Sequence, residues 1–254
     1  MRPKTHVVEV WGDFACFTRP ECKVERFSYP VPPPSAARGI FDAIYCKPNK
    51  DPSQAEFRWQ ITKIEILAPV SYIALRRNEV KDKANVSAIL KWMSGKAEPE
   101  PLWADGVGVD TKGRTQRQTM ALKSVRYRLH GEIRPWLGHE ERLPAFEAQF
   151  QRRVERGKCF AQPCFGFREF PAYFGPPQPE NAPVEGVNYD LGLMLYDVFD
   201  LSCPGTVYSA PCVSLFHAEV RNGIMEVPDY ADDAVLKGAE IQRADKEDPT
   251  CSIN

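Results

Sequence analysis

The sequence predicts an α+β fold, and three patterns support this prediction. Apolar residues recur at helical spacing over residues 35–48 and 143–158. Apolar and polar residues alternate over 120–133, which is typical of a strand with one buried face. Short apolar runs over 185–229, separated by proline, glycine and the Asn222-Gly223 pair, predict a small antiparallel sheet.

The first predicted strand covers residues 6–17, and a short helix follows after a loop. Ser35 can cap this helix, and Pro48 cannot continue it. Tyr45 then lies near the edge of the sheet, beside Lys47. Because a nearby cation can lower the pKa of a tyrosine, Tyr45 is a candidate proton-transfer group. The alternative is that Tyr45 only packs against the end of the helix.

The loop between these two elements, residues 18–34, mixes cations with aromatic residues and prolines. Its cations are Arg19, Lys23 and Arg26. Such a mixture suits single-stranded RNA, because bases stack on rings while phosphates pair with cations. The alternative is an ordinary surface loop that packs against its own aromatic residues.

A strand with a bulge is expected next, because the alternation over residues 57–66 slips near Thr62 and Lys63. The following stretch, 71–119, is rich in lysine and arginine and has few apolar periods, so it is expected to be an unstructured insertion. It is either a clamp for nucleic acid or another subunit, or a mobile solvated loop.

The strand over 120–133 carries Arg126, Arg128 and His130 on its polar face. Arg114, Arg117 and Lys123 come before these residues in the chain, and no acidic residue lies between Asp110 and Arg126. We therefore expect a positively charged track for RNA, with a solvated sheet face as the alternative.

The second predicted helix, 143–158, ends in cations that suit either the negative end of the helix dipole or a phosphate. An aromatic strand is expected over 159–174. The resulting order of strand, helix, strand, strand, helix, strand is typical of the ferredoxin-like fold that RNA-recognition domains also use. The predicted organisation is a ferredoxin-like domain over 1–175, a proline-rich linker, an antiparallel sheet extension over 185–229 and a polar tail over 230–254.

The composition of the chain limits the kinds of function that we expect for it. The chain has 254 residues and a formal net charge of -1, so any binding of nucleic acid depends on local patches of charge. The eight cysteines lack ligand spacing for zinc, and we expect no metal and no cofactor. With no signal peptide and no long apolar run, we expect a soluble, cytoplasmic protein that does not bind membranes.

Several motifs occur in the order found in one known family. They cover residues 10–20, 35–40, 43–48, 76–80, 152–160 and 166–170. The sequence resembles the CRISPR-associated family five proteins, subtype d (also called c), of type I-C systems. The resemblance extends over most of residues 6–229 and implies a ferredoxin-like, repeat-associated RNA-processing protein.

This resemblance also implies an activity. Members cut precursor CRISPR RNA at the base of the repeat hairpin without a metal, and they stay on the 5′ handle as a subunit of the interference complex. Tyr45 matches the family's active-site tyrosine. The family's adjacent lysine and histidine align with Ala145 and Phe146, which can neither move a proton nor carry charge; His139 or Arg142 are possible substitutes.

The candidate catalytic residues are therefore Tyr45, His130 and Lys123. The expected partners are the repeat hairpin and the 5′ handle, the backbone and large subunits of the complex, and double-stranded DNA. Two alternatives stay open: a handle-binding scaffold that does not cut, and a general RNA-recognition module. The candidate RNA-binding residues are Arg19, Lys23, Arg26, Arg38, Lys47, Arg76, Arg77, Arg114, Arg117, Arg126, Arg128, Arg152, Arg153 and Lys158.

Overall fold

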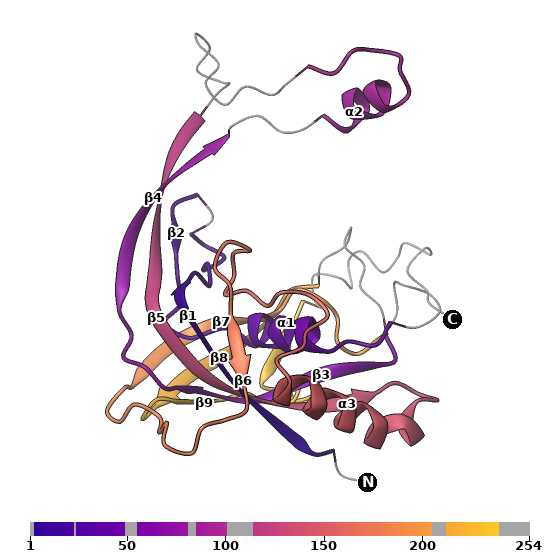
Figure 1. Cartoon of the computed structure of the whole chain (residues 1–254). Coiled ribbons are helices and arrows are strands. Elements are labelled where there is room, and N and C mark those ends of the chain that lie inside the picture. Colours follow the sequence, from indigo (N-terminus) through magenta and orange to yellow (C-terminus); the bar gives the residue numbers. More distant parts are fainter. Residues whose placement is uncertain are drawn as a thin grey trace.

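The computed structural model describes residues 3–22, 24–48, 55–80, 85–100, 114–204 and 212–238, with the backbone alone at positions 79, 80 and 114. It is a mixed α and β structure with a curled antiparallel sheet (Figure 1). The helices are α1 (Pro34–Ile44), α2 (Val86–Met93) and α3 (Leu143–Glu155), with a short 3-10 turn at Glu140–Arg142. The strands are β1 (Thr5–Ala15), β2 (Arg26–Phe27), β3 (Phe57–Ile66), β4 (Tyr72–Val80), β5 (Arg114–Pro135), β6 (Tyr173–Gly175), β7 (Tyr189–Asp197), β8 (Ser214–Arg221), β9 (Ile224–Glu226) and β10 (Val235–Lys237).

The described strands form one sheet, in which β5 is the central member. The order is β10-β8-β9-β3-β5-β1-β6, while β2 and β4 also pair with β5, and β7 pairs with β8. The bulge predicted in β3 is confirmed by a register shift between Ile61 and Lys63. The aromatic strand predicted over 159–174 is wrong in extent, because only Tyr173–Gly175 pairs as β6.

The insertion predicted to be unstructured is largely a two-stranded arm. Over residues 72–80, β4 pairs with the first part of β5, and α2 lies at the far end of the arm (Figure 1). Ser124 of β5 has a φ of 52°, in the left-handed region that a residue with a Cβ rarely adopts, and it lies between the residues that pair with β4 and those that pair with β3. Ile73 and Leu75 of β4 alternate as half-buried residues that pack against the core, but this apolar stripe is short and polar residues follow it at 76–79, so the strand was not recognised.

One face of the sheet carries α1 and α3. Phe41 of α1 and Phe150 of α3 stack at 5.4 Å, and both pack on Trp59 of β3. The predicted Ser35 cap is wrong: α1 begins at Pro34, whose fixed φ and missing N–H suit the first helical position. None of the helices in the described ranges is long and apolar enough to cross a membrane.

The opposite face of the sheet is covered by residues 176–184, which were predicted to be a linker. Glu9 is fully buried there and accepts hydrogen bonds from the backbone N–H of Gln178 and the side chain of Asn181. Arg126 Nη1 lies 2.5 Å from one carboxylate oxygen of Glu9, and Arg128 Nη2 lies 3.6 Å from the other. This segment is therefore bound to the sheet by a buried ionic network.

The C-terminal strands continue the same sheet. Asn222 and Gly223, with φ of 49° and 76°, make the predicted tight turn between β8 and β9, and β9 pairs with β3. The tail predicted from 230 onward is wrong for its described part. Tyr230 is buried and Val235–Lys237 forms β10, whereas 239–254 lie outside the described residues.

We predict that acid destabilises the protein through His6, whose ring lies between Trp59 and Phe150 at 5.9 and 5.2 Å. Burial, followed by the charge of Lys4, lowers the pKa of His6 from 6.5 to about 4. Between pH 6.5 and 4, the His6 side chain is therefore protonated in the unfolded chain but neutral in the folded chain. The free energy of unfolding should be highest above pH 6.5 and fall by about 3 kcal/mol toward pH 4.

Chemical denaturation at several pH values tests this prediction. His6→Phe should remove the part of the pH dependence that lies between pH 6.5 and 4. His217→Phe is the matched control, because the His217 side chain is 64% exposed. An unchanged slope in the His6 variant would contradict the assignment.

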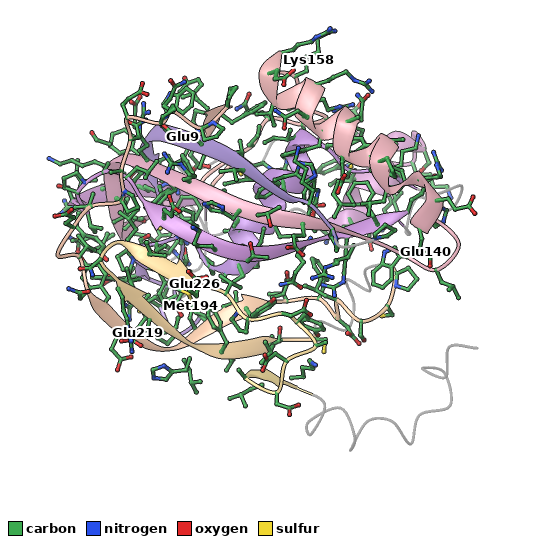
Figure 2. The ribbon with its side chains drawn as sticks, turned by 90° about the horizontal axis from the view of Figure 1, so that it is seen from below. Glu9, Glu140, Lys158, Met194, Glu219 and Glu226 are labelled. Atoms are coloured by element: carbon green, nitrogen blue, oxygen red, sulfur yellow. The ribbon has the colours of Figure 1, made fainter. Side chains whose placement is uncertain are left out.

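We also predict that Glu9→Gln lowers the free energy of unfolding by about 3 kcal/mol, because it removes the buried counter-charge of Arg126 and one of the two buried carboxylates that Arg128 pairs with, the other being Glu65. Protease cleavage within residues 176–184 should become faster. The matched control is Glu219→Gln, at an exposed position of β8 well apart from Glu9 (Figure 2), where the carboxylate pairs with the exposed Arg221. Equal effects of the two substitutions would show that the buried network around Glu9 contributes no more to the free energy of unfolding than an exposed ion pair does.

Candidate active site and nucleic-acid interface

Tyr45 occupies a buried position directly after α1, against the start of β3. It is the C-terminal cap of α1, and only 6% of the residue is exposed. Its ring lies 5.4 Å from that of Phe57, and its main-chain oxygen accepts a hydrogen bond of 3.0 Å from Trp59 Nε1. The aromatic core therefore fixes the position of the phenol.

Two arginines and a glutamate surround this tyrosine, and we call the group the Tyr45 cluster (Tyr45, Glu56, Arg142 and Arg153). The guanidinium carbon of Arg153, in the last turn of α3, lies 5.3 Å from the centre of the Tyr45 ring. Its Nη1 donates to the carbonyl of Ile44 at 2.8 Å. Arg142, just before α3, places Nη1 2.5 Å from Glu56 Oε2. Both ends of α3 thus bring a cation to the end of α1.

Burial raises the pKa of Tyr45; Arg153 and Arg142 oppose this increase, while Glu56 adds to it. The expected lowering of this pKa is therefore wrong in its net direction, because burial outweighs the cations. The phenol stays protonated at neutral pH, so it can donate a proton or a hydrogen bond. The arginines supply positive charge beside it, which suits an anion that gains charge during reaction.

The positions aligned with the family's lysine and histidine have different environments. Ala145 is exposed on α3, whereas Phe146 is 2% exposed and packs 5.0 Å from the Phe57 ring. His139 lies in the turn that ends at Arg142, where the N–H of Arg142 binds the carbonyl of His139 at 3.1 Å. Of the two substitutes considered, Arg142 belongs to the Tyr45 cluster.

The structure does not bring His130 and Lys123 to Tyr45. Successive strand residues face opposite sides, and Gly131 faces Phe41 of α1, so His130 points to the other face of the sheet. There His130 Nε2 lies 3.1 Å from Glu65, and burial lowers the pKa of His130. Lys123 is seven residues before His130 in β5, which is roughly 23 Å along the strand at about 3.3 Å per residue. The expectation that these three residues form one site is wrong.

Three of the predicted RNA-binding arginines lie over aromatic rings near the base of the arm, in two separate groups. Arg26 and Arg77 each place a guanidinium 4.7 Å from the centre of the Phe167 ring. Arg19 lies 4.9 Å from the ring of Tyr29 and 5.6 Å from that of Phe27. We call these six residues the arm-base surface. Arg77 also pairs with Glu169.

Other predicted cations have structural partners. Arg38 is largely buried and joins α1 to β7 through Asp197, with Nε to Oδ2 at 2.7 Å, and it also pairs with Asp42. Arg126 and Arg128 bind the buried Glu9, so the open cationic track expected on β5 is wrong for both. The signal missing from the local sequence was Glu9, which is more than a hundred residues away.

The remaining predicted cations differ in exposure. Arg152 is exposed and binds Gln149 at 2.6 Å. Of Arg114, only the backbone is described, and Lys23 lies outside the described residues. Exposed or half-buried positions are occupied by Lys47, Arg76, Arg117 and Lys158. The part of the chain that the structure describes holds no cluster of three or more His, Cys, Asp or Glu placed to bind a metal ion.

Comparisons with known proteins agree on one family. The model of the Cas5d family, described as CRISPR-associated protein (Cas_Cas5), matches residues 5–228. The chain is 38% identical over 237 residues to a CRISPR pre-crRNA endoribonuclease Cas5d of Thermus thermophilus, covering 87% of this chain and 90% of that protein. It is 39% identical over 231 residues to the protein of the same name from Mannheimia succiniciproducens, covering 88% and 94%.

A solved structure has the same fold. The crystal structure of a CRISPR-associated protein superposes with a TM-score of 0.58 at 20% identity, covering 92% of this chain and 97% of that one. The family model covers β1 to β9, both helices that pack on the sheet and the Tyr45 cluster. The chain therefore belongs to the Cas5d family of CRISPR-associated proteins.

Proposed function

We propose that this protein is a metal-independent endoribonuclease of the cytoplasm that cuts precursor CRISPR RNA at the repeat hairpin. It then stays on the 5′ handle as a subunit of a type I-C interference complex. Both relatives are named CRISPR pre-crRNA endoribonucleases. The observation that carries the proposal is the Tyr45 cluster, in which a protonated phenol lies beside two arginines and a carboxylate.

The proposed reaction uses the 2′-hydroxyl of the RNA as nucleophile. Its oxygen bonds to the adjacent phosphorus, the bond from phosphorus to the 5′ oxygen breaks, and a 2′,3′-cyclic phosphate results. The carboxylate of Glu56 is the acceptor in the cluster for the 2′-hydroxyl proton, and Tyr45 donates a proton to the leaving 5′ oxygen. Arg142 and Arg153 stabilise the crowded phosphate as its charge increases.

We also propose that the core is ferredoxin-like. Strands β3, β5, β1 and β6 lie side by side and each neighbouring pair is antiparallel, with α1 following β1 and α3 following β5. This order supports the split βαβ arrangement. The arm-base surface then lies at the end of the sheet from which the arm extends.

The arm-base surface is our candidate for the handle-binding site. Its guanidiniums lie over aromatic rings, so a phosphate and a base can be bound together. Backbone and large subunits of the complex, and double-stranded DNA, are the other proposed partners.

The second candidate function is a scaffold that binds the handle but does not cut. It is favoured by one observation: the positions aligned with the family's lysine and histidine are Ala145 and the buried Phe146. Binding by the arm-base surface needs neither residue.

We predict that Tyr45→Phe lowers the cleavage rate about a hundredfold or more, because the proton donor is lost while the ring still packs on Phe57. The measurement is cutting of an end-labelled repeat hairpin in EDTA, with binding measured in parallel. Tyr173→Phe, at an exposed tyrosine on β6, is the matched control. Tight binding without cutting by the wild type would establish the scaffold, and cutting that EDTA abolishes would overturn metal independence.

We further predict that Arg26→Ala and Arg77→Ala each weaken binding of the RNA handle and reduce its salt dependence by about one unit of slope. Filter binding at several salt concentrations measures both quantities. Arg221→Ala, at an exposed arginine of β8, should change neither. Unchanged binding in both arm-base variants would exclude this surface from handle recognition.

A further inference from the structure

Phe160 is an exposed aromatic residue held next to the Tyr45 cluster. It follows α3, and 64% of it is exposed. The N–H groups of Phe160 and Ala161 both donate to the carbonyl of Ala43, at 2.8 and 3.0 Å. Ala43 lies in the last turn of α1, two residues before Tyr45. The backbone of Phe160 is therefore fixed relative to the proposed proton donor.

The surroundings of Phe160 are cationic. α3 ends before Gly157, whose φ of 61° turns the chain, and Arg156 and Lys158 on either side are exposed. Figure 2 shows Lys158 at one end of α3 and Glu140 at the other. Arg142 lies beside that second end, so cations are present at both ends of α3 with Tyr45 between them.

An isolated exposed apolar residue needs no special explanation. Phe160 differs because two main-chain hydrogen bonds attach it to the helix end that carries Tyr45, and because cations flank it. A ring beside cations is the combination that binds a nucleotide, since the base stacks on the ring and the phosphate pairs with the charge. No aromatic partner within the described residues is recorded for this ring, so one of its faces is available to a base.

We propose that Phe160 stacks on an unpaired base of the RNA next to the phosphate that is cut. This proposal rests on the proposed ribonuclease function and deepens it. Phe160 is a binding residue: it orders the nucleotide chain along α3, so that the scissile phosphate lies between Tyr45 and the arginines of the cluster. It should act on unpaired nucleotides of any sequence, because every base has a face that can stack.

The probe is the repeat-hairpin RNA of the cleavage assay, with a 2′-deoxy nucleotide at the cut so that binding is measured without cleavage. Phe160→Ala should weaken binding about tenfold, and Phe160→Trp should restore it. Tyr173→Ala removes another exposed aromatic residue, on the sheet face opposite α3, and is expected to leave binding unchanged.

A second set of RNAs carries an abasic site at each unpaired position around the cut in turn. At one position the abasic site should weaken binding by the wild type and have no further effect on Phe160→Ala, because both changes remove the same stacking contact. If every abasic RNA loses as much affinity for the variant as for the wild type, the stacking proposal is wrong.

The two proposals fail in distinguishable ways. A wild-type protein that neither binds nor cuts the hairpin overturns the proposed function. A wild-type protein that binds or cuts, together with a Phe160→Ala variant of equal affinity and rate, overturns only the role of Phe160. Circular dichroism checks that the Phe160→Ala variant is folded. If it is not, binding by Phe160→Trp and binding of the abasic RNAs by the wild type test the stacking proposal instead.

Discussion

The backbone hydrogen bonds of β5 are the interaction on which the rest of the structure depends. Over its length β5 pairs with β1, β2, β3 and β4. Its residues up to Leu122 pair with β4 in the arm, and its residues from Tyr127 onward pair with β3 in the sheet. Ser124, with a φ of 52°, lies between these two parts. Strands β2 and β4, which carry Arg26, Phe27 and Arg77 of the arm-base surface, pair with β5, and α3, which carries Arg153 of the Tyr45 cluster, follows it in the chain.

The arginines on β5 and at the base of the arm have two different roles. Arginines on the second half of β5 are neutralised by the buried Glu9 and hold residues 176–184 on the sheet. Arginines at the base of the arm lie over aromatic rings, and Arg77 also pairs with Glu169. The first set stabilises the fold, and the second set is suited to a polyanion.

The sequence predicted much of the fold and little of the site. Local alternation and spacing predicted the strand over 120–133, the slip in β3, the apolar stripe of α3 and the turn at Asn222. Such patterns exist because one face of each element is buried. In β4 of the arm this pattern is limited to Ile73 and Leu75, which was too short to be recognised, so the strands of the arm were missed.

The site depends on contacts between residues distant in the chain. Tyr45 was a candidate both from its place at the end of the predicted helix and from the family resemblance. Its neighbours Glu56 and Arg142 lie just before β3 and in the turn before α3, and the fold brings them to it. His130 was chosen because it lies near cations in sequence, yet strand alternation places it on the other face of the sheet. Local spacing in the sequence predicts neither which arginine pairs with which carboxylate nor whether the pKa of Tyr45 is raised or lowered, because both depend on burial in the folded chain.

The most direct test of this account is a structure of the protein bound to a repeat hairpin with a 2′-deoxy nucleotide at the cut. The account predicts that the scissile phosphate lies beside the phenol of Tyr45, between Arg142 and Arg153. A phosphate bound on the opposite face of the sheet, near His130 and Arg128, would contradict it.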